Sequence, residues 1–123
     1  MKKMIAMVLA LMLCLSMAAC GGAGNADYKV GICQLMKHDA LDAATKGFQD
    51  ALTAKLGDKV TFDVQNASGD SALCTTIANN FIAEDVDLIL ANATQALQAV
   101  YAATGDIPIL GTSITDYAAA LDM

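Results

Sequence analysis

Two short polar stretches of this sequence are well suited to bind a small molecule. Residues 92–94 (NAT) directly follow one apolar run, and residues 111–113 (GTS) follow another. Amide and hydroxyl side chains give directional hydrogen bonds, and free N–H groups at a strand-to-helix turn stabilise a carboxylate or another anion. Taken alone, Thr94 and Ser113 could equally be helix caps. If the fold brings such residues together, they indicate a binding site for a small polar molecule.

Residue types for covalent or metal chemistry are present but poorly arranged. His38 is the only histidine, and its neighbours Lys37 and Asp39 do not by themselves define an acid–base geometry. Nucleotide-binding glycine motifs and the G-x-S-x-G motif are absent from the sequence. Cys33 and Cys74 do not have a metal-binding spacing; they could pair in an exported protein, or be two small buried residues. We therefore expect no catalytic residue, metal or cofactor, and keep an exported thiol-dependent enzyme or redox protein as the alternative.

The polar stretches are positioned by a regular alternation of apolar runs and amphipathic segments. The predicted strands cover residues 28–35, 60–66, 86–91 and 107–111. The predicted helices cover residues 39–56, 70–84, 94–104 and 116–121, with Asp39 as the expected cap of the first. Strict alternation predicts parallel strands joined by helical crossovers, and the central strands are apolar on both faces. The expected fold class is therefore α/β, a three-layer structure with helices on both faces of a parallel sheet.

The carboxyl ends of parallel strands lie along one edge of the sheet, and ligands of open α/β folds bind there. The loops at this edge are residues 34–39, 65–68, 92–94 and 111–116. They are rich in neutral hydrogen-bonding groups. A receiver domain would need an acidic cluster at the same strand ends, whereas this sequence has Gln34, Gln65 and Asn92 there.

The N-terminal segment is typical of an export signal. Lys2 and Lys3 precede an uncharged run, residues 4–17, which is too short to span a bilayer comfortably. Residues 17–20 (MAAC) resemble the lipobox of bacterial lipoproteins, in which the cysteine is acylated. We therefore expect a signal peptide at residues 1–19, a lipid anchor on Cys20 and a flexible linker over residues 20–27. The expected location is the extracytoplasmic face of the cell membrane.

Charge argues against nucleic acid as a partner. The formal net charge is −6, all seven basic residues are lysines, and two of these lie in the expected signal. A mature chain that is more acidic still, without any arginine, is a poor ligand for phosphate backbones or acidic headgroups.

Four stretches together resemble a known family. They are KVGICQLMKHDALDAATKGFQDAL (29–52), FDVQNASGD (62–70), DLILANATQALQA (87–99) and DIPILGTSITDYAAALDM (106–123). The sequence is similar to the bacterial ABC transporter substrate-binding lipoproteins that include tryptophan- and tyrosine-binding receptors. The resemblance implies a periplasmic-binding-protein-like (Venus flytrap) fold, in which two α/β lobes close over one ligand, and an ABC permease as partner.

The resemblance also implies a set of ligand-binding residues at the cleft wall. They are Gln34, His38, Asn92, Ala93, Thr94, Thr112, Ser113, Thr115 and Asp116. The ligand that the resemblance implies is an amino acid, and aromatic amino acids are among the candidates. Tyr117 is the one aromatic side chain of the protein that we expect near the binding site. A sugar or nucleoside receptor of the same fold is the alternative. Since one lobe needs ~100–150 residues, residues 28–123 are expected to form most of a truncated N-terminal lobe with an exposed sheet edge.

Overall fold

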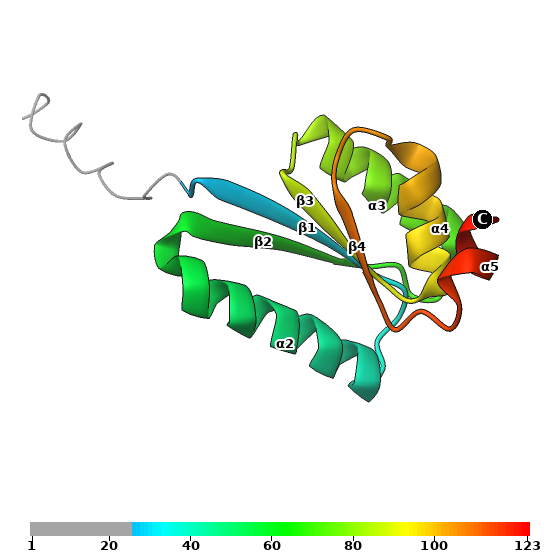
Figure 1. Ribbon diagram of the computed structural model, residues 1–123, viewed down its shortest axis with the longest axis horizontal. Coiled ribbons are helices and arrows are strands. Elements are labelled where there is room, and N and C mark those ends of the chain that lie inside the picture. The colour runs from blue at the N-terminus through cyan, green and yellow to red at the C-terminus, as the bar shows by residue number, and fades with distance from the viewer. Residues whose placement is uncertain (1–25) are drawn as a thin grey trace, which may run out of the picture.

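The structure, a computed structural model, describes residues 26–123 (Figure 1). In this part of the chain, four parallel strands form one sheet in the order β2-β1-β3-β4. The strands are β1 (Tyr28–Gln34), β2 (Val60–Asn66), β3 (Leu88–Asn92) and β4 (Ile109–Thr112). The predicted parallel α/β sheet is confirmed.

Two strands begin later than their apolar runs suggested. The run from Val86 becomes a strand only at Leu88, because the Val86 N–H still donates to the Phe81 carbonyl, 3.2 Å away, in the turn that leaves the preceding helix. The run from Ile107 becomes a strand at Ile109, after a proline that has no N–H to donate to a ladder.

The helices lie on both sides of the sheet (Figure 1). They are α2 (Asp39–Leu56), α3 (Ser71–Ala83), α4 (Thr94–Ala103) and α5 (Tyr117–Leu121), with a 3₁₀ turn, η1 (Gly57–Lys59), after α2. Helix α2 packs on one face, and α3, α4 and α5 pack on the other. Each long helix begins at the carboxyl end of a strand and ends beside the amino end of the next, so the two ends of the sheet carry different turns.

Local capping sets where the helices start. His38, in extended conformation, caps α2 by accepting the Ala40 N–H on its Nδ1 at 3.2 Å. Asp39, the cap predicted from sequence, is instead the first residue of the helix. Its negative carboxylate there interacts favourably with the positive end of the helix dipole. Asp70 caps α3 by accepting the Ala72 and Leu73 N–H groups.

The two faces of the sheet have separate apolar cores. Val30, Ile32 and Leu90 point toward α2, and neighbouring strand residues such as Ile89 and Ala91 point toward α3 and α4. This alternation explains why the central strands are apolar on both faces. None of the helices in residues 26–123 is long and apolar enough to cross a membrane.

Candidate functional site

The last residues of the four strands form one row across the sheet. The register pairs Gln34 with both Asn66 and Asn92, and Asn92 with Thr112. The strand-end loops that the sequence singled out therefore do lie along a single edge. Backbone hydrogen bonds join them: the Ala67 N–H donates to the Gln34 carbonyl at 2.9 Å, and the Ala93 N–H donates to the Thr112 carbonyl at 3.0 Å.

Two members of this row are buried and bound to helix α2. The Gln34 amide donates to Asp42 Oδ1 at 2.6 Å and to the Met36 carbonyl at 2.8 Å. The Asn92 amide donates to the Leu41 carbonyl at 2.8 Å and to Thr45 Oγ1 at 2.9 Å. Thr45 joins the two amides, since its hydroxyl donates to Gln34 Oε1 at 2.7 Å.

This network fixes the first turns of α2 onto the end of the sheet. Gln34 is 3 % exposed and Asn92 fully buried, so neither presents its amide to solvent. The resemblance implies ligand contact for both residues; in this structure their amides face helix α2. Asn92 Oδ1 is the exception to the satisfied pattern: it is buried and has no partner among the described residues.

The loops at this edge hold an unusual backbone. Of the five non-glycine residues with positive φ in residues 26–123, three lie one or two residues after a strand end: Ser68 (φ 53°), Ala93 (φ 96°) and Ser113 (φ 59°). Non-glycine residues rarely adopt positive φ, and such strain concentrates at functional sites. At Ala93 the strained residue is also the N-cap of α4, and no described side chain caps the first turn of that helix. The N–H groups of this turn thus remain suited to an anion.

The other predicted residues lie at or beside the same edge. His38 and Ser113 are exposed, while Thr94 and Thr112 are half-buried at the ends of α4 and β4. Thr115 and Asp116 are exposed in the loop before α5. One carboxylate oxygen of Asp116 is already used as the cap of α5, because Oδ1 accepts the Ala119 N–H at 3.1 Å.

Tyr117, the aromatic expected near the mouth, packs across the end of β4. Its hydroxyl donates to the Gly111 carbonyl at 2.7 Å, and a methyl group added at Gly111 would lie 2.8 Å from the ring. Gly111 therefore makes room for the ring, which remains about half exposed.

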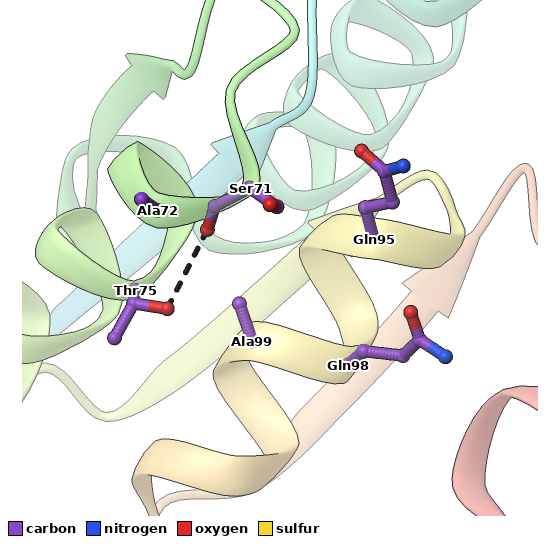
Figure 2. Close-up of a pocket in the computed structure, with 6 residues that line it drawn as sticks. All are labelled: Ser71, Ala72, Thr75, Gln95, Gln98 and Ala99. Atoms are coloured by element: carbon purple, nitrogen blue, oxygen red, sulfur yellow. Dashed lines mark hydrogen bonds between the residues drawn. The ribbon is translucent and has the colours of Figure 1, made fainter.

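A groove that the sequence did not reveal opens between α3 and α4 (Figure 2). It has a volume of about 460 Å³ and is lined by Ser71, Ala72, Thr75, Gln95, Gln98 and Ala99. Ser71 and Gln95 belong to the first turns of the two helices, so the groove begins at the carboxyl edge of the sheet. The strand-end rule could have found it if the first helical turns had been included with the loops.

The thiols offer poor nucleophiles. Cys33 and Cys74 are fully buried, and burial, followed by the neighbouring Cys74, raises the pKa of the Cys33 thiol to about 12. At neutral pH the reactive thiolate is therefore scarce. Residues 26–123 contain no cluster of three or more histidine, cysteine or acidic side chains that could hold a metal ion.

Comparison with known proteins agrees with the resemblance seen in the sequence. The ABC transporter substrate binding protein family matches residues 29–121. A tyrosine-binding protein of Clostridioides difficile (strain R20291) is 46% identical over 90 residues, which cover 71% of this chain and 26% of the relative.

Solved structures give the same result. The ligand-free, open structure of a substrate-binding protein with adhesive properties from Clostridium difficile has a TM-score of 0.72 at 43% identity, over 76% of this chain and 32% of that one. An ABC domain from Streptococcus pneumonia in complex with L-Trp has a TM-score of 0.71 at 36% identity, over 76% of this chain and 32% of that one. The chain thus spans about a third or less of these relatives. It belongs to the family of ABC transporter substrate-binding proteins.

Proposed function

We propose that this chain forms one wall of the ligand site in an amino-acid receptor that serves an ABC importer, and that the ligand is aromatic. The ligand class rests on the relatives, of which one is named for tyrosine and another was solved with L-Trp. The proposal that this lobe binds the ligand along one edge of its sheet rests on the fold. The edge offers neutral donors and acceptors, which suit reversible binding rather than catalysis.

The observation that carries the proposal is the turn at Ala93. Ala93 has a positive φ, and α4 begins there at the same edge as the turns at Ser68 and Ser113. A ligand carboxylate placed at this turn would be stabilised by backbone N–H groups and by the Thr94 hydroxyl. The adjoining groove between α3 and α4 provides space for the rest of an amino acid.

With this arrangement the protein would capture a ligand and deliver it to the permease. A second lobe closing over the edge would exclude water from the ligand, and the permease would bind the closed form. Ligand then acts by shifting an open–closed equilibrium, to the extent that it binds the closed form more tightly. No bond in the ligand is made or broken.

Binding by the full-length protein tests the ligand class. We expect L-tyrosine or L-tryptophan to bind one per protein in a calorimetric titration. Thr94→Val should weaken binding by roughly tenfold, as expected for the loss of one hydrogen bond to a charged group. Thr53→Val, an exposed threonine in the last turn of α2, is the matched control and should leave binding unchanged. Binding of a sugar or nucleoside and of no amino acid would contradict the proposal.

We also propose that the protein is exported and anchored through Cys20, which lies outside the described residues, as do the expected signal and most of the linker. The lipobox-like sequence supports this proposal. In cell fractionation, wild-type protein should sediment with membranes and Cys20→Ala should appear in the soluble fraction, because stable anchoring needs the acyl chains. Cys14→Ala, within the expected signal, is the matched control. Membrane retention of Cys20→Ala would contradict lipid anchoring at this residue.

A further inference from the structure

Cys33 and Cys74, which play no part in the proposed ligand site, lie side by side in the core. Cys33 is on β1 and Cys74 is in the first turns of α3, yet both side chains are fully buried in the same cluster. Burial raises the pKa of both thiols, and the neighbouring Cys74 raises that of Cys33 further. Both are unpaired cysteines in the described part of the chain.

We propose that Cys33 and Cys74 form a disulfide as the chain folds, by exchange with a disulfide oxidant. The oxidising compartment in which this would occur rests on the export proposed above. Both side chains belong to one buried cluster in which α3 packs on the sheet, so the bond would join two elements that are already packed together.

The exchange is balanced in two steps. One cysteine thiolate attacks a sulfur of the oxidant, forming a mixed disulfide and releasing one oxidant thiolate. The second cysteine thiolate then attacks the first cysteine's sulfur, closing the Cys33–Cys74 bond and releasing the other thiolate. The protein loses two protons and two electrons, and the oxidant is reduced to two thiols.

Burial determines when the reaction can take place. In the folded chain both thiols are inaccessible, and burial raises the pKa of each. The exchange must therefore precede closure of the core around α3, and the finished bond would resist reductants until the protein unfolds. The bond would attach the first turns of α3, and with them Ser71 and Thr75 of the groove, to the sheet.

The test is refolding of the full-length protein from denaturant in oxidised and reduced glutathione, followed by alkylation and tryptic mapping. Lysines at 29, 37 and 59 place Cys33 in a peptide of residues 30–37 and Cys74 in a peptide that begins at Val60. We expect these two peptides to be joined. Both cysteines recovered alkylated, or each carrying glutathione, would overturn the proposal.

A thermal readout adds an independent check. The linked protein should melt on the order of 10 °C above the same protein reduced in denaturant and refolded with reductant, since the cross-link restricts the unfolded chain. Cys33→Ala/Cys74→Ala should not respond to reductant. Calorimetry with L-tyrosine on the same samples separates the two proposals. Unlinked cysteines in a protein that binds overturn only the disulfide, and linked cysteines in a protein that binds no amino acid contradict only the proposed function.

Discussion

Thr45→Val is expected to lower the free energy of unfolding by about 2–5 kcal/mol, although the two side chains have nearly the same shape. The change leaves Gln34 Oε1 without its donor and the Asn92 amide without one acceptor, and all three residues are buried. A buried polar group without a partner costs about 1–3 kcal/mol. Urea unfolding, followed by far-ultraviolet circular dichroism, measures the effect.

Thr53→Val is the matched control for this substitution, since it makes the same change on the exposed side of the same helix. We expect it to alter stability by no more than about 0.5 kcal/mol. Equal effects of the two substitutions would show that the hydroxyl of Thr45 does not bind the strand ends to α2.

Gly31→Ala is expected to destabilise the protein by about 3 kcal/mol, at the upper end of the usual cost of overpacking. A Cβ at position 31 would lie 2.7 Å from the Cγ and Cδ2 atoms of Phe81. The ring is fully buried between α3 and the sheet, so it has little freedom to move away. Thermal or chemical unfolding measures the loss.

Two further variants identify the cause of that loss. Gly47→Ala, in α2, meets no atom within 4 Å and should stabilise the protein by about 0.5–1 kcal/mol, because alanine favours a helix over glycine. Phe81→Leu combined with Gly31→Ala should lose less than the sum of the two single changes, since the shorter side chain gives space to the new methyl group. Strict additivity would rule out the Phe81 contact as the cause.

Most of the fold could be predicted because apolar runs and helical periodicity alternate without interruption. The runs gave each strand, and alternation gave the parallel sheet. The prediction was wrong only at the ends of helices and strands, where a single hydrogen bond determines which residue begins the element. The helix cap moved by one residue, from Asp39 to His38, and Pro108 delayed β4.

The candidate site was predicted less completely. The strand-end rule found the edge, but it does not say which strand-end side chains a helix covers. Gln34 has the same orientation as Ile32, which packs under α2, so its amide faces Thr45 rather than solvent. The strain at Ala93 and the groove beside Gln95 depend on backbone angles and helix packing, which residue types alone do not specify.

The opposite end of the sheet has a practical value. The 3₁₀ turn after α2 and the loop around Gly105 lie at the amino ends of the strands, and a Cβ atom added at Gly105 would meet no atom within 4 Å. A cysteine-reactive fluorophore or a surface tether placed there would report on, or immobilise, the protein without touching the opposite edge, where we propose that the ligand binds. If the proposed site is right, a label at Gly105 and the bound ligand would lie at opposite ends of the sheet, which is the arrangement that a biosensor needs.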